Sequence, residues 1–184
     1  MPDTLLETIC LSPSKATPLT PEARGAECLL GDDSTVRSPL PRFEVCRGLW
    51  VDYAPDAGVE TDISQTAEGL RFSTHTTGTS PWYSLSFDID INALRDSDYL
   101  GIKFDLTSSG PARLRVCLRY HLADGFRDSF AKEVIVLTGG VQSGLITHPI
   151  QSVLTSDALG SEVLLFVEGR SFDFTLGGLH PILI

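Results

Sequence analysis

Apolar and polar residues alternate with a period of two through most of the chain from Phe43 onward. This alternation is typical of strands that bury one face, because successive side chains of a strand point to opposite sides. The clearest alternations predict strands at residues 49–53, 69–75, 82–91, 99–106 and 112–122. More apolar segments predict further strands at residues 132–137, 162–167, 172–176 and 179–184.

Clusters of turn-forming residues separate these segments, at residues 77–79, 108–111, 124–125, 139–140 and 177–178. Asp124-Gly125 is the strongest hairpin signal, because glycine adopts the positive φ that a tight hairpin turn requires. About nine or ten short strands and no strong helix predict an all-β domain. We expect an antiparallel β-sandwich of the jelly-roll type, since one face of most strands stays polar.

The first 42 residues differ from the rest in composition. They hold six of the eleven prolines, which exclude helix interiors and central strands. We therefore predict a partly ordered proline-rich arm at residues 1–42, followed by a β-sandwich domain at residues 43–184. Capping residues allow short helices at Asp3–Cys10 and Pro21–Leu30, and a flexible leader is the alternative interpretation.

The net charge of the chain argues against two classes of binding partner. The 184-residue chain has a formal net charge of −10, which disfavours nucleic acid and anionic membrane surfaces. No run approaches the roughly 20 apolar residues of a membrane span, and no signal-peptide pattern precedes residue 30, so we expect a cytoplasmic protein. The four cysteines, at positions 10, 28, 46 and 117, lack C-x-x-C spacing and are expected to be reduced thiols.

The polar positions of the predicted strands gather basic and aromatic residues. If those strands share a sheet, one face carries a candidate ligand-binding set: Arg71, Trp82, Lys103, Arg115, Arg119 and His121. Arginine binds carboxylates bidentately, and a tryptophan ring offers an apolar plane for a sugar. The alternative is a solvated sheet face, on which aspartates such as Asp88 and Asp105 pair with the basic residues.

Residues 43–184 resemble the jelly-roll sandwiches of carbohydrate-binding modules and related galactose-binding-like domains. The resemblance rests on three stretches, GLRFSTHTTGTSPWYSLSFDI, YLGIKFDLTSSGPARLRVCLRYHLADG and RSFDFTLGGLHPILI. It implies glycan binding on a concave sheet face or at loop tips, together with a structural calcium ion. Such modules are usually secreted or joined to an enzyme, and these 184 residues show neither feature, so we expect a departure from the family in this respect. The exposed aromatic residues match those of the family only loosely.

No nucleophile elbow, phosphate-binding glycine loop or zinc-protease motif is present in the sequence. Weaker combinations remain open: a metal site from His75, His121 and Asp88, a thiol–base pair of Cys117 with His121, and an acid–base pair of Asp88 with Asp90. We therefore predict a non-catalytic domain, without cofactor or metal beyond the implied calcium, that binds a carbohydrate or sugar acid. The alternatives are an assembly module that contacts a protein or a second copy through the arm or the apolar residues 179–184, and a jelly-roll enzyme.

Overall fold

The fold is known from a computed structural model. It describes residues 35–36, 41–46, 48–55, 58–78, 82–150, 154–169 and 171–184. Within them lie ten strands and one short helix. The strands are β1 (Thr35–Val36), β2 (Arg42–Cys46), β3 (Leu49–Tyr53), β4 (Val59–Thr66), β5 (Gly69–Thr76), β6 (Tyr83–Ile89), β7 (Tyr99–Leu122), β8 (Gly125–Pro149), β9 (Gly160–Glu168) and β10 (Ser171–Leu183).

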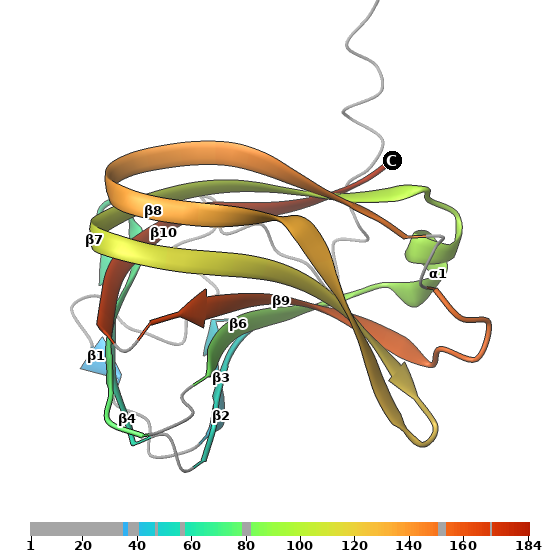
Figure 1. Ribbon diagram of the computed structural model, residues 1–184, viewed down its shortest axis with the longest axis horizontal. Coiled ribbons are helices and arrows are strands. Elements are labelled where there is room, and N and C mark those ends of the chain that lie inside the picture. The colour runs from blue at the N-terminus through green and yellow to red at the C-terminus, as the bar shows by residue number, and fades with distance from the viewer. Residues whose placement is uncertain are drawn as a thin grey trace, which may run out of the picture.

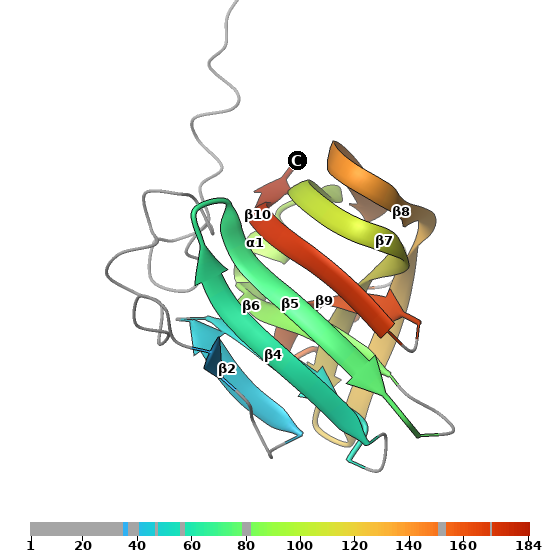
Figure 2. The same ribbon diagram turned by 90° about the vertical axis from the view of Figure 1, so that its left-hand side faces the viewer.

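The strands form an antiparallel β-sandwich, as predicted, and the long β7–β8 hairpin belongs to both of its sheets. The first half of β7 pairs with β10, and its second half pairs with β9. We call β1-β4-β5-β10 with the adjoining half of the hairpin the first sheet, and β2-β3-β6-β9 with the other half the second sheet. Figure 2 faces the first sheet, and in Figure 1 β7 and β8 arch over the molecule from one sheet to the other.

The length of β7 and β8 corrects two predicted turns. Residues 108–111 and 139–140 lie within continuous strands, and the β7–β8 register shifts between Ser108 and Pro111. Opposite this shift, Gly139 and Gly140 have φ of 102° and 81°, a conformation that glycine adopts easily. These residues bend the hairpin where it passes between the sheets. The turn predicted at residues 177–178 is likewise a bulge inside β10.

A hairpin forms where Asp124-Gly125 predicted one, but its two-residue tip is Ala123-Asp124, and Gly125 is the first residue of β8. Four elements were not predicted: the strands β1, β2 and β4, and the helix α1 (Ile91–Arg95), whose N-cap Asp90 accepts a hydrogen bond from the Asn92 backbone. No helix of the described part of the chain is long and apolar enough to cross a membrane.

The range predicted for the arm is described only at residues 35–36 and 41–42. Residues 35–36 form β1, which pairs with β4, and Arg42 begins β2. The two helices predicted in the arm lie outside the described residues.

The core lies between the sheets and is rich in aromatic rings. Phe72 stacks on Phe174, with ring centroids 5.3 Å apart, and Phe172 packs edge-on against Tyr83 at 5.1 Å. These rings come from β5, β10 and β6, so they join the two sheets. The apolar C-terminal residues also contribute, because Leu179 and Leu183 are buried in β10.

The bend of β8 brings together two polar residues that are nineteen positions apart. The Ser129 hydroxyl and Nε2 of His148 are 2.9 Å apart, and His148 is buried. Burial lowers the pKa of His148 below 6.5, and nearby Glu133 opposes this effect. The folded state therefore disfavours the charged imidazole.

We expect stability to fall as the pH drops below about 6.5 and passes through the lower folded pKa, because the unfolded chain then binds the proton more readily. Urea midpoints of the wild type and of His148→Gln between pH 8 and pH 5 measure this. The urea midpoint of His148→Gln should fall less between pH 8 and pH 5 than that of the wild type. The midpoint of His121→Gln, a substitution at a half-exposed site, should fall as much as that of the wild type. An unchanged pH dependence in His148→Gln would assign the decrease to other groups.

Candidate functional site

The strand register places a distinctive set of side chains on the outer face of the second sheet. Residues paired directly across antiparallel strands point to the same side. The pairs Arg42–Asp52, Asp52–Ser84, Ser84–Phe166 and Phe166–Arg115 therefore define one face across β2, β3, β6, β9 and β7. We call it the aromatic–arginine face, after Arg42, Trp50, Trp82, Arg115, Arg119, Phe126, Phe130 and Phe166.

The centre of this face is more deeply buried than its surroundings. Ser84, Ser86 and Cys117 are fully buried although they point away from the core. By contrast, Trp82 is 43% exposed and Phe126, near the hairpin tip, is 60% exposed. In Figure 1 the sheet arches, with β2 and β3 on one side of β6 and β9 and the hairpin tip on the other. The side chains around Ser84, Ser86 and Cys117 thus cover a buried polar centre.

Two carboxylates occupy this centre, and Arg42 bridges them. Its Nη1 lies 3.4 Å from Oδ1 of Asp52, and its Nη2 lies 3.2 Å from Oε1 of Glu162, which is 2% exposed. The Ser86 hydroxyl donates to Asp52 at 3.0 Å, and Nε2 of His121 is 3.6 Å from Glu162. Burial raises the pKa of Asp52, although Arg42 and Ser86 counteract the shift.

The other arginines of the face are paired as well. Arg119 forms two hydrogen bonds to Asp128, at 2.6 and 2.8 Å, and these raise its pKa. Arg115 and Arg113 both contact Glu168, at 3.6 and 3.2 Å. Every arginine on this face therefore has a carboxylate partner, which fixes its position and offsets its charge.

Aromatic rings lie between and over these ion pairs. The Arg119 guanidinium lies 4.0 Å from the ring centre of Phe126, and that of Arg115 lies 4.3 Å from Phe130. The ring of Phe166 packs against two others: its centre lies 5.6 Å from that of Phe130 and 6.5 Å from that of Trp82. Both tryptophans of the chain belong to this face. Chemically, the face combines apolar planes with fixed N–H donors and carboxylate acceptors.

The structure brings together four of the six predicted site residues. Trp82, Arg115, Arg119 and His121 share the aromatic–arginine face, but Arg71 and Lys103 lie on the outer face of the first sheet. The prediction of a single shared face is wrong for these two, because β7 passes from the first sheet to the second between residues 103 and 115.

Sequence reasoning also missed several residues of the face: Arg42, Trp50, Phe126, Phe130, Glu162 and Phe166. The alternation in residues 49–53 already placed Trp50 opposite the buried Leu49 and Val51, so this residue could have been found. Arg42 fell in the range assigned to the arm. Around Phe126 and Phe130 the residues that face the other side, Arg127 and Ser129, are polar, so this segment lacks the apolar core-facing positions that mark a strand.

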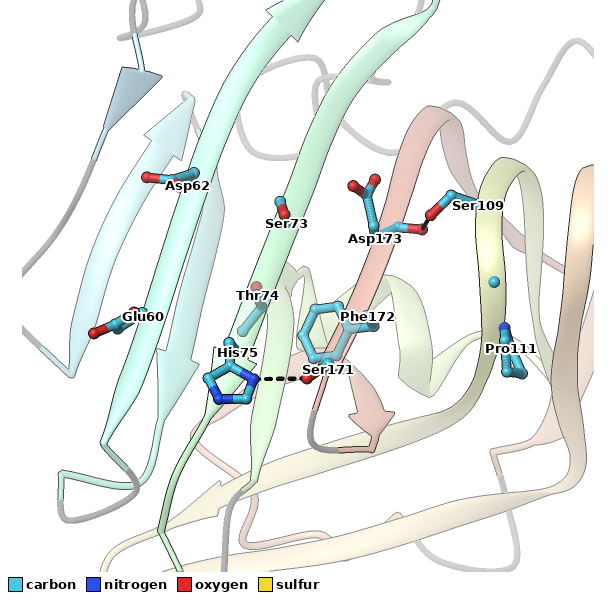
Figure 3. A pocket seen from close by; sticks show the side chains of 11 residues that line it. Glu60, Asp62, Ser73, Thr74, His75, Ser109, Pro111, Ser171, Phe172 and Asp173 are labelled. Carbon is cyan, nitrogen blue, oxygen red and sulfur yellow. Dashed lines mark hydrogen bonds between the residues drawn. The ribbon is translucent and has the colours of Figure 1, made fainter.

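The outer face of the first sheet carries a separate polar groove of about 470 Å³ (Figure 3). His75 bonds Ser171 through Nδ1 at 2.7 Å, and Asp173 belongs to both this groove and the neighbouring hollow that contains Arg71. Arg71 binds Asp173 bidentately, at 3.0 and 2.5 Å, so it is committed to an ion pair on the surface. No exposed Phe, Tyr or Trp side chain lines the described part of this groove.

The weaker catalytic and metal combinations do not assemble. His75 lies on the first sheet and His121 on the second, which separates the metal ligands proposed with Asp88. Cys117 is a free, buried thiol, and burial raises its pKa to about 12, so it does not ionise near neutral pH. Asp90 caps α1 instead of acting with Asp88.

A calcium site of the kind that the resemblance implies needs several oxygen ligands close together. Throughout the described residues, no three His, Cys, Asp or Glu side chains gather to hold a metal ion. A calcium site built from such side chains is therefore not found in that part of the chain.

Comparison with solved structures identifies the fold. The xylan-binding domain CBM22-1 of Paenibacillus barcinonensis Xyn10C matches with a TM-score of 0.50 and 13% identity, over 75% of this chain and 86% of that domain. A module from a study of promiscuous specificity in β-sandwich carbohydrate-binding modules matches with a TM-score of 0.51 and 11% identity, over 84% and 63% of the two chains. The chain has the jelly-roll β-sandwich fold of carbohydrate-binding modules.

A third match extends to a larger protein. Xylanase 10C of Cellvibrio japonicus, solved with xylopentaose, matches with a TM-score of 0.50 and 15% identity, over 77% of this chain but only 28% of the xylanase. No protein-family model and no curated protein matches the sequence. At these identities the likeness describes the fold, and the ligand has to be argued from the site.

Proposed function

We propose that this protein is a non-catalytic carbohydrate-binding domain whose ligand lies on the aromatic–arginine face. The observation that carries the proposal is the gathering of both tryptophans and three phenylalanines with paired arginines around a buried polar centre. Sugar rings have apolar faces and hydroxyl edges, and this face offers planes for the first and fixed donors and acceptors for the second. Structural neighbours described as binding xylan, or solved with xylopentaose, support the class of ligand.

The charge pairing favours neutral sugars over sugar acids. Arg42, Arg115 and Arg119 each face a carboxylate already, and Asp52 and Glu162 add negative charge at the centre. An incoming uronate would have to displace or approach these carboxylates, whereas a hydroxyl can accept from a guanidinium N–H that stays in its ion pair.

A glycan array that includes neutral xylo- and gluco-oligosaccharides and uronic-acid polymers tests both statements. We expect neutral glycans to bind, and we expect Arg115→Gln combined with Arg119→Gln to weaken the best ligand by about tenfold or more, since each charged hydrogen bond contributes about 1.5–3 kcal/mol. The matched control is Arg71→Gln combined with Lys103→Gln, on the other sheet, which should bind as the wild type does.

The binding of the two variants tests the location of the site, and the choice of glycan tests the neutral-sugar specificity. Full binding in the Arg115/Arg119 variant, or lost binding in the Arg71/Lys103 variant, would contradict this location of the site. Preferential binding of uronic-acid polymers would contradict the neutral-sugar specificity. Thermal midpoints within a few degrees of wild type should accompany every binding measurement, so that loss of binding is not confused with unfolding.

A further inference from the structure

One long edge of the sandwich is unpaired in the described structure. β8 pairs with β7 along its length, and no other described strand lies on its second edge. Such an edge presents a row of unpaired backbone N–H and C=O groups, which is a template for another strand. Proteins usually protect such edges with charges, prolines or short strands.

The other two edge strands carry this protection. β1 has two residues, and β2 has five and includes Arg42 and Glu44. β8 has twenty-five residues, and no Asp, Glu, Lys or Arg occurs between Glu133 and Asp157. In a chain with 21% charged residues, the sixteen uncharged residues 134–149 of this edge are a long interruption.

Apolar side chains accompany this uncharged edge. Val141 is 78% exposed and Leu145 is 54% exposed, and both point to the outer face of the first sheet, opposite Thr107 and Lys103 of β7. Val136, before the bend, is 51% exposed. β-Branched and aliphatic side chains favour strand pairing, so these residues suit a β-sheet contact.

We propose that β8 is a self-association edge, along which residues 141–145 pair in antiparallel fashion with the same segment of a second copy. A two-fold axis makes the contact self-complementary. Centred on Ser143, it sets Val141 of one copy opposite Leu145 of the other, and each chain then offers the same apolar pair. This proposal does not depend on the proposed carbohydrate binding, because Val141 and Leu145 lie on the first sheet.

The uncharged segment of β8 is a place where two copies of this acidic chain can meet with little local repulsion. Two molecules with a net charge of −10 repel each other, and the uncharged segment of β8 adds no local repulsion. Salt screens the remaining long-range repulsion. Dimerisation should therefore strengthen as salt is raised, in contrast to an interface that rests on ion pairs.

Sedimentation velocity of the full chain over a concentration series, at low and high salt, measures the association. We expect a species of twice the 19.9 kDa chain mass that increases with salt. Combining Val141→Lys with Leu145→Lys should raise the dissociation constant by about tenfold or more, because it places like charges opposite each other. Leu159→Lys is the control, since Leu159 is 70% exposed and lies outside β8.

Cysteine trapping locates the axis. Ser143→Cys should form a disulfide-linked dimer on mild oxidation, whereas Thr147→Cys, away from the axis, should form much less, with the wild type as the baseline. A wild type that stays monomeric at every concentration and salt level would overturn the proposal. So would a dimer that the lysine variant leaves intact, or one in which Thr147→Cys cross-links as readily as Ser143→Cys.

Discussion

Replacing Trp82 with alanine is expected to weaken glycan binding by about thirtyfold, which corresponds to about 2 kcal/mol, the loss typical of a central tryptophan in a recognition surface. Trp82 is 43% exposed, and its ring meets Phe166 at an angle of 68°, so one face of the indole is available while the neighbouring ring holds it in place. Isothermal titration with the best glycan from the array measures the change.

The matched control for this prediction is Tyr99→Ala. Tyr99 has a similar exposure, 48%, but it lies at the start of β7 in the first sheet. Its removal should leave the affinity unchanged. Phe166→Ala should give a smaller loss than Trp82→Ala, since Phe166 contributes by supporting two other rings. Equal effects of Trp82→Ala and Tyr99→Ala would contradict the assignment of the ligand to this face.

The alternation of apolar residues predicted the fold class and most strands, because half-buried strands leave a local pattern in the sequence. Residues 112–122 show this well: Leu114, Val116, Leu118 and Tyr120 are all buried in the core. β4 escaped prediction because VETDISQT has few apolar residues, and its place in the sheet depends on pairing with β5. Local patterns identify strands, but pairing partners are set by contacts between distant segments.

The same limit explains why the site was predicted only in part. Arg115 and Arg119 were found because they alternate with core residues within one strand, and His121 continues that pattern. Arg71 and Lys103 alternate just as regularly, but alternation does not report which sheet a strand joins. The bend at Ser108 and Gly139-Gly140, which moves the hairpin from one sheet to the other, resembles two ordinary turns in the sequence. Glu162 was the hardest residue to predict, because a charged residue near a strand end is usually exposed. It is buried here through its contacts with Arg42 and His121, which come from distant parts of the chain.

Arg42 should be the most important of the arginines for stability, and Arg42→Met is expected to destabilise the fold by about 2 kcal/mol. Removal of one member of a buried ion pair leaves uncompensated charge, at a cost of about 3–5 kcal/mol when both partners are buried. We expect less here because the Arg42 side chain is 50% exposed and water compensates in part. Its partners are well buried: the side chain of Asp52 is 13% exposed and that of Glu162 only 2%. Urea denaturation measures the loss.

Arg113→Met makes the same substitution on the same face and tests the reason for this effect. The Arg113 side chain is 59% exposed, and its partner Glu168 is 37% exposed, so loss of this pair should change the unfolding free energy by less than about 0.5 kcal/mol. Without Arg42, the raised pKa of Asp52 should rise further, since Arg42 is the main opposing influence. A carboxyl with a raised folded pKa supports the fold best when protonated, so the Arg42→Met defect should be larger at pH 7 than at pH 4. Equal losses in the two variants, or a defect independent of pH, would show that Arg42 acts through packing on Trp50 and not through the buried carboxylates.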